Sequence, residues 1–107
     1  MTLRDIADAL LTVGVPVFHY EAHQQSDRYI VWAEDGQVGA LWADGKLEEQ
    51  WLGGTIDYFT KAEYDDSIVA IQAALNEIDV SWRLESVQYE DFSGYIHYEW
   101  TWAAWLG

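Results

Sequence analysis

The spacing of apolar residues changes along this chain, and that change constrains its fold more than any other feature. In two segments apolar residues recur every three or four positions, the period of a helix buried on one side. These two stripes are Leu3, Ile6, Leu10 and Val13, and then Ile68, Ile71, Leu75 and Ile78. Elsewhere apolar and polar positions alternate, as along Ile96, Tyr98, Trp100 and Trp102. Alternation places successive side chains on opposite faces of a strand, so the pattern predicts two helices and a sheet.

Capping residues indicate where the predicted helices begin and end. Thr2 suits the N-cap of the first helix, with Asp5 in its first turn. Gly14 suits a left-handed end to that helix, and Pro16 prevents its continuation. Asp65 or Asp66 is expected to cap the second helix. Each apolar stripe thus has its own start signal.

The remaining segments predict the strands of the sheet. Strands are expected at residues 15–20, 29–33, 48–60, 80–89 and 95–105. The turn residues Asp35 and Gly36 are expected to end the second of these. Residues 36–47 contain another turn at Asp44 and Gly45, and they are predicted to form either a short strand or an ordered projecting loop.

Short connections between these strands favour antiparallel pairing. Residues 90–94 end in a glycine and predict a hairpin, while Gly53 and Gly54 indicate a bulge or a close backbone approach within a long strand. The expected fold class is α+β, with two helices packed on one face of a mostly antiparallel sheet of four or five strands. The expected order is α-β-β-(β)-β-α-β-β. A length of 107 residues fits one domain, residues 1–107.

The charge balance limits what the protein is expected to bind. The chain contains five Lys and Arg residues and 19 Asp and Glu residues, so its formal net charge is -14. Nucleic acids and anionic membranes are bound through cations, so neither is an expected partner. The acidic surface serves solubility alone, faces a basic protein, or lines a channel through which DNA passes without sticking. The absence of cysteine excludes disulfides and thiolate chemistry, and no targeting or membrane-spanning segment is recognisable.

No pattern typical of catalysis or of cofactor binding stands out. His19, Glu21 and His23 alternate and resemble a three-ligand zinc set, but they are interpreted as solvated residues at the end of a strand. Residues 39–46 have the wrong glycine spacing for a phosphate loop, and no Ser or Thr follows Lys46. Adjacent carboxylates are expected to cap helices or face water. From the sequence we therefore expect that the protein is not an enzyme, has no catalytic residue, and binds no cofactor or metal.

Seven tryptophans are the most distinctive part of the composition. Large aromatic side chains fill small cores, which is expected to account for about half of them. A two-layer domain of this size has difficulty burying the rest, and exposed Trp is typical of protein interfaces. Trp42 and Trp51 flank the uncertain segment and Trp105 lies near the C-terminus. These three are the predicted interface residues.

Several segments together resemble the tail-completion, or tail-terminator, proteins of long-tailed phages and prophages, a head–tail joining and minor capsid-like group. The resemblance spans nearly the whole chain and is carried by residues 3–6, 15–17, 54–61 and 95–100, and by the helix containing Asp66, Ile68, Ile71 and Leu75. None of these motifs is catalytic. The resemblance implies a ring, typically of six subunits, that caps the tail tube and joins it to the head. It also implies a loop or hairpin that projects from the sheet to contact neighbouring subunits, for which residues 34–47 are the candidate.

The expected function is therefore structural. The expected partners are other copies of the chain, the tail tube protein and head–tail connector proteins. The expected location is the tail or neck of the virion, and the host cytoplasm during assembly. The alternative is an acidic inhibitor that imitates DNA and blocks a DNA-binding enzyme, which the net charge favours. A third and weaker hypothesis is a metal hydrolase that uses His19 and His23.

Overall fold

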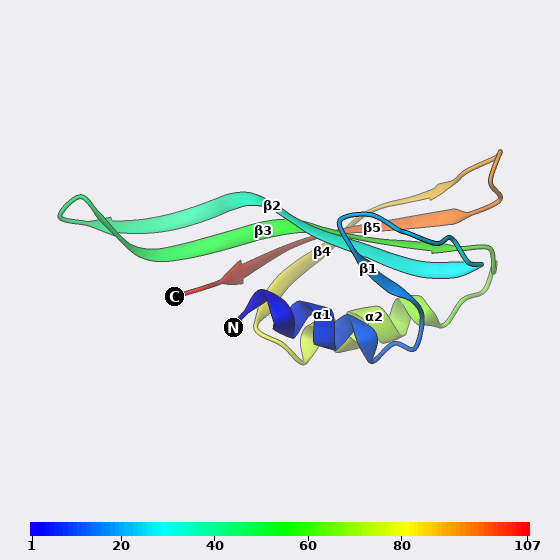
Figure 1. Cartoon of the computed structure of the whole chain (residues 1–107), viewed down its shortest axis with the longest axis horizontal. Coiled ribbons are helices and arrows are strands. Elements are labelled where there is room, and N and C mark those ends of the chain that lie inside the picture. The colour runs from blue at the N-terminus through cyan, green and yellow to red at the C-terminus, as the bar shows by residue number, and fades with distance from the viewer.

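A computed structural model of the protein describes all of residues 1–107 and has the predicted α+β architecture. In chain order the elements are α1 (Leu3–Leu11), β1 (Val17–His19), β2 (Arg28–Ala43), β3 (Lys46–Thr60), α2 (Ser67–Asn76), β4 (Val80–Tyr89) and β5 (Ile96–Trp105). Figure 1 shows both helices against the same face of the sheet, and no helix covers the opposite face. Neither helix is long and apolar enough to cross a bilayer.

The five strands form one sheet in the order β1-β2-β3-β5-β4. The pairs β2–β3, β3–β5 and β4–β5 are antiparallel, and only β1 runs parallel to its neighbour β2. Pro16 has no backbone donor, which suits its place at the start of an edge strand, where its carbonyl accepts from the N–H of Ile30 at 2.8 Å. β1 is shorter than predicted because Tyr20 adopts a φ of +74° and leaves the extended conformation.

The first helix begins and ends near the predicted signals. The Asp5 carboxylate accepts a hydrogen bond from the backbone N–H of Thr2 at 2.8 Å, which satisfies a donor at the helix start. After Leu11 the chain turns, and Gly14 has a φ of +89°, a conformation that a residue with a Cβ rarely adopts. Ile6 and Leu10 from the predicted stripe are fully buried against the sheet.

The second helix is anchored to the sheet by a buried carboxylate. The side chain of Asp65 is 1% exposed. It accepts hydrogen bonds from the hydroxyls of Tyr58 and Thr60, both at 2.6 Å, and from the N–H of Ser67 at 2.8 Å. Burial raises the pKa of Asp65, but the hydrogen bonds from Thr60, Tyr58 and Ser67 outweigh it and lower the pKa to about 2. Of the two candidate caps, Asp65 therefore supplies the side-chain hydrogen bond and Asp66 does not.

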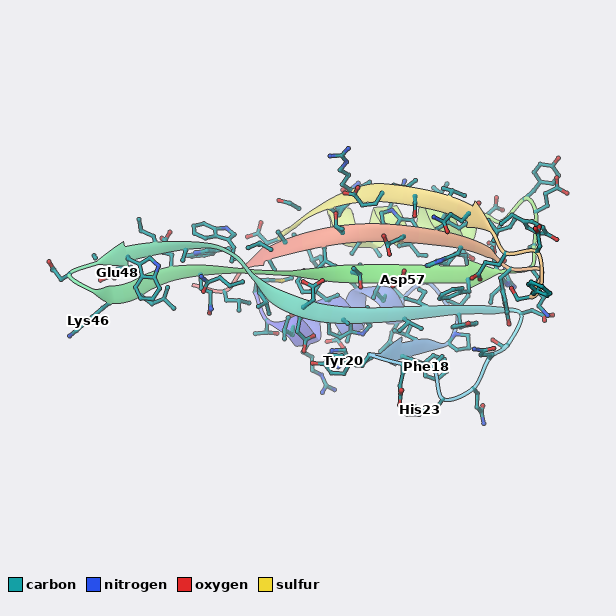
Figure 2. The ribbon with its side chains drawn as sticks, turned by 90° about the horizontal axis from the view of Figure 1, so that it is seen from above. Phe18, Tyr20, His23, Lys46, Glu48 and Asp57 are labelled. Atoms are coloured by element: carbon teal, nitrogen blue, oxygen red, sulfur yellow. The ribbon has the colours of Figure 1, made fainter.

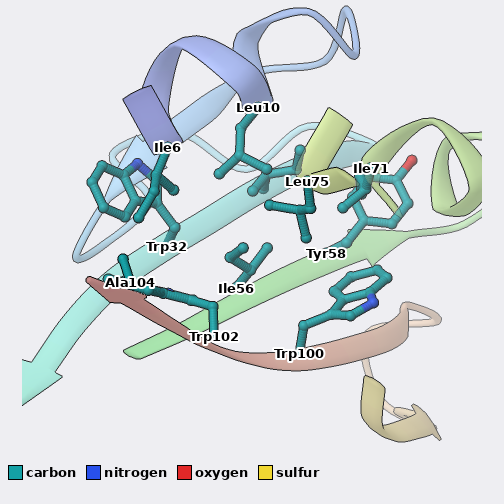
Figure 3. Close-up of a cluster of buried hydrophobic side chains, with 11 residues drawn as sticks. Ile6, Leu10, Trp32, Ile56, Tyr58, Ile71, Leu75, Trp100, Trp102 and Ala104 are labelled. Atoms are coloured by element: carbon teal, nitrogen blue, oxygen red, sulfur yellow. The ribbon is translucent and has the colours of Figure 1, made fainter. Parts of the chain in front are cut away.

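The core lies between the helices and the covered face of the sheet, as Figure 3 shows. It contains Ile6, Leu10, Ile30, Trp32, Ile56, Tyr58, Ile71, Leu75, Trp100, Trp102 and Ala104. Each large apolar side chain buried in this way contributes about 1.5–3 kcal/mol relative to an exposed one. The helical stripes and the alternating residues of β5 thus meet in a single hydrophobic layer, as their spacing predicted.

The prediction that a turn at Asp35 and Gly36 ends the second strand is wrong. β2 is sixteen residues long, from Arg28 to Ala43, and stays paired with β3 on both sides of Asp35 and Gly36. The pairing shifts register between Glu34 and Gly36, so the extra residue is absorbed as a β-bulge instead of a turn. The predicted close approach at the glycine pair is confirmed, because a Cβ on Gly54 would lie 1.9 Å from the carbonyl oxygen of Ala33.

Candidate functional site

The most exposed feature of the fold is a two-stranded projection from the end of the sheet. β3 pairs with β5 only as far as Trp51, which lies opposite Trp105. Beyond this point residues 40–50 of β2 and β3 pair with each other, and we call this segment the arm; one further backbone hydrogen bond, from the N–H of Leu106 to the carbonyl oxygen of Gln50 at 2.9 Å, ties its base to the chain after β5. Figure 2 shows Lys46 and Glu48 near its tip, far from Asp57 in the body of the sheet. The predicted projection, residues 34–47, overlaps the arm, and of the two predicted forms, a loop or a hairpin, the structure has the hairpin.

The arm makes the whole molecule elongated. The principal extents are 52 × 25 × 23 Å and the radius of gyration is 15.1 Å. A compact chain of this length has a radius of gyration of about 13 Å. An isolated two-stranded hairpin is marginally stable in water, and its unpaired edges are templates for further strand pairing. The arm therefore extends into solvent with no layer packed upon it, and its edges are unpaired beyond the bond between Leu106 and Gln50.

Local sequence explains how the arm reverses direction. Asp44 and Gly45 have φ values of +52° and +73°, the signs of the tight hairpin turn that Asp-Gly favours. Ala43 pairs with Lys46 directly across this turn. The third register shift between β2 and β3 follows Leu41, where the pairing skips Glu48. The turn predicted at Asp44 and Gly45 is thus confirmed.

Apolar side chains are exposed along the arm. Trp42 is 59% exposed and lies directly opposite Leu47, which is 43% exposed, and Leu41 is also exposed. Val38 is exposed at the base of the arm. Isolated exposed apolar residues are common, but a cluster on one projecting element is typical of an interaction surface.

Two of the three predicted interface tryptophans come together at the base of the arm. Trp51 and Trp105 are cross-strand partners, and Trp105 is 44% exposed. The ring of Trp51 covers Gly39, where a Cβ would meet it at 3.5 Å. Both side chains line a depression of about 220 Å³ together with Ile78 and Val80. Trp42 lies farther out, so the three predicted residues mark the arm and its base but form no single cluster.

The other four tryptophans belong to the body of the protein. Trp32, Trp100 and Trp102 are buried in the core. Trp82 is half-buried against it, and its indole N–H donates to the side-chain oxygen of Asn76 at 2.9 Å. The division of the seven indoles between core and surface therefore agrees with the expectation from composition.

The alternating His19, Glu21 and His23 do not come together as a ligand set. Nε2 of His19 lies 2.7 Å from the carboxylate of Glu34, and its ring stacks on Trp32. His23 packs edge-on against Phe18 in the loop before β2. Burial raises the pKa of the Glu34 carboxyl, but hydrogen bonds from Tyr20 and His19 outweigh it and lower that pKa below its usual value. The expectation of a site built from His19 and His23 thus finds no geometric support.

The third histidine instead joins two carboxylates on the face of the sheet that the helices leave open. Nε2 of His97 lies 2.7 Å from Oδ1 of Asp57, and Glu99 is the residue directly opposite Asp57. One ligand atom from each of the three lies within 4.8 Å of the other two. The sequence shows that His97 and Glu99 share a strand face, but their proximity to Asp57 depends on the register of β3 against β5.

Comparison with known proteins identifies no relative, since neither the protein-family models nor the curated protein sequences match this chain.

Proposed function

We propose that this protein is a structural assembly protein of a long-tailed phage or prophage, which caps the tail tube and helps to join tail to head. The proposal rests on the resemblance of its sequence motifs to those of tail-terminator proteins. It assigns no catalytic role to any residue. The observation that carries it is the arm, because a free two-stranded hairpin with exposed apolar residues is suited to contact a neighbouring copy.

A closed ring requires each subunit to present two different, complementary surfaces. The exposed pair Trp42 and Leu47 supplies an apolar surface at one end of such a contact. The depression at the base of the arm, lined by Trp51 and Trp105 but also by the polar residues Asp79 and Ser81, supplies a concave surface for the other. Insertion of the arm of one copy at the base of the next would repeat around an axis and close by rotation.

The acidic surface fits a ring around passing DNA, since like charges discourage adhesion to phosphates. The alternative, an inhibitor that imitates DNA, calls for a regular row of carboxylates. On the open face of the sheet Asp57 and Glu99 are instead interspersed with Thr55, His97 and Thr101. No feature of the fold favours that alternative over assembly.

The direct test is the length of tails assembled without this protein, measured by electron microscopy. We expect tails of irregular length after deletion of the gene. Complementation with wild-type protein or with Phe92→Ser, a fully exposed aromatic far from the arm, should restore uniform length. The double variant Trp42→Ser/Leu47→Ser should not restore it. Uniform tails in the absence of the protein would refute the proposed function.

A further inference from the structure

The open face of the sheet gathers three side chains of the types that bind transition metals. Asp57 on β3 and Glu99 on β5 are directly opposite each other, and His97 lies two residues before Glu99 on the same face. We propose that Asp57, His97 and Glu99 form a binding site for a divalent transition-metal ion of the zinc class. This site goes beyond the proposed assembly function and differs from the sequence-based expectation of no metal.

Electrostatics favours a cation between these side chains. Two carboxylates directly opposite each other in a sheet repel and destabilise it. The side chains of Asp57 and His97 are only 20% and 21% exposed, so solvent screens this repulsion less than at an open surface. The whole chain also carries a formal charge of -14, which raises the local concentration of cations. A dication bound by both carboxylates replaces repulsion with attraction.

The geometry needs only small side-chain adjustments to hold a metal. In a tetrahedral site, zinc bonds of 2.0–2.2 Å place neighbouring ligand atoms about 3.3–3.6 Å apart. The His97–Asp57 separation of 2.7 Å is shorter than this, because the two side chains are hydrogen-bonded, and the upper limit of 4.8 Å for the three ligand atoms is longer. Rotation about the side-chain bonds of Glu99 and Asp57 closes this difference while the backbone pairing stays intact. The ring of His97 stacks on Phe59 at 4.3 Å, which restricts its orientation.

The ligand set selects among metals. One imidazole with two carboxylates suits zinc and neighbouring transition metals, whereas magnesium and calcium prefer oxygen ligands throughout. Three protein ligands leave at least one coordination position for water. Asp57 also lines a depression of about 340 Å³ with Glu21, Gln25 and Tyr29, so solvent reaches the cluster from that side.

The fold contains an internal control for this proposal. His19 and Glu34 also form a histidine–carboxylate pair at 2.7 Å, but that pair is not part of a three-ligand cluster. A simple hydrogen-bonded pair does not hold zinc tightly, because one histidine and one carboxylate supply too few ligands. The variant His19→Asn should therefore leave metal binding unchanged, while His97→Asn and Glu99→Gln should weaken it.

The experiment is a calorimetric titration of chelator-treated, full-length protein with Zn²⁺ in a large excess of Mg²⁺. We expect one equivalent of Zn²⁺ to bind and, at a hundredfold excess over Kd, to raise Tm by at least about 5 °C. His97→Asn and Glu99→Gln should each lose at least about tenfold in affinity. Circular dichroism checks that each variant folds, and Glu99→Gln provides the test if His97→Asn does not.

Three results would overturn the proposal: no stoichiometric binding by the wild-type chain, equal binding by folded Glu99→Gln, or complete displacement of Zn²⁺ by Mg²⁺. The last result would indicate diffuse attraction to an acidic surface. Because the arm is remote from the cluster, the loss of metal binding in a variant does not test tail-length control, and the two proposals can be refuted separately.

Discussion

Among individual residues, Asp65 contributes most clearly to the connection between the two layers. Its carboxylate is buried where β3 ends and α2 begins, and it accepts hydrogen bonds from both elements. Arg28 on β2 lies 3.8 Å away and adds a weaker charge interaction. A buried carboxylate without such donors would take up a proton, because burial penalises the charged form. The hydrogen bonds that Asp65 accepts therefore hold its pKa low in spite of its burial.

The pKa of Asp65 leads to a prediction about stability in acid. The pKa is about 2 in the folded protein. An unfolded Asp has a pKa of about 3.9, so the ionised group contributes about 2–3 kcal/mol to the free energy of unfolding at neutral pH. This contribution is complete above pH 4 to 5 and is lost as pH falls towards about 2.

Asp65→Asn should therefore be less stable than wild type by about 2–3 kcal/mol at pH 7. The difference should shrink as pH falls through this window, because the wild-type carboxylate becomes protonated. Urea unfolding followed by tryptophan fluorescence measures both quantities. Asp66→Asn is the matched control, since Asp66 is exposed and makes no side-chain capping bond. Equal loss in the two variants would show that Asp65 has no special role.

At the scale of elements, the sequence predicted the helices and turns that local residues determine, and missed features that depend on which strands pair. The helices have capping residues and apolar stripes, and the β4–β5 hairpin has a glycine with a φ of +76° at position 94, so each was found. A projection at residues 34–47 was predicted, but the continuity of β2 into it was missed because Asp35 and Gly36 have the composition of a turn. Whether such a pair forms a turn or a β-bulge depends on the partner strand. Here β3 offers partners for β2 beyond Gly36, as far as its first residue, Lys46.

The arm should be the least protected part of the sheet in an isolated subunit. Its backbone hydrogen bonds lie in a two-stranded hairpin without a packed layer, so local opening costs little free energy. Amides of residues 40–50 should exchange with deuterium at least about tenfold faster than those of residues 54–60, which are paired on both sides. Mass spectrometry of peptides from the two segments measures this ratio. Equal protection would mean that the arm is stable without a partner.

For the whole molecule, the candidate sites show the same limit of prediction. Trp42, Trp51 and Trp105 were predicted as interface residues because the size of the domain limits how many indoles it buries; in the structure Trp42 and Trp105 are exposed and Trp51 is half-buried. The cluster around His97 was not identified, because Asp57 lies forty residues earlier and only the β3–β5 register unites them. Composition thus predicts how much aromatic surface remains exposed, while the long-range pairing of strands decides which charged residues meet.

The total charge leads to the last prediction, which concerns self-association. Copies that each carry a formal charge of -14 repel one another, whereas contacts through the arm are apolar. Raising the ionic strength from about 0.1 M to about 1 M shortens the Debye length from about 10 Å to about 3 Å and weakens that repulsion. The proposed arm contact therefore predicts a rising average mass with added NaCl, measured by analytical ultracentrifugation.

The variant Trp42→Ser/Leu47→Ser keeps the same charge and should remain monomeric at every salt concentration, while Phe92→Ser should behave as wild type. Dissociation on adding salt would mean that ion pairs hold the copies together. Association of the arm variant to the same extent would place the contact elsewhere on the surface. Because the three proteins carry equal charge, any difference among them reports the apolar surface of the arm alone.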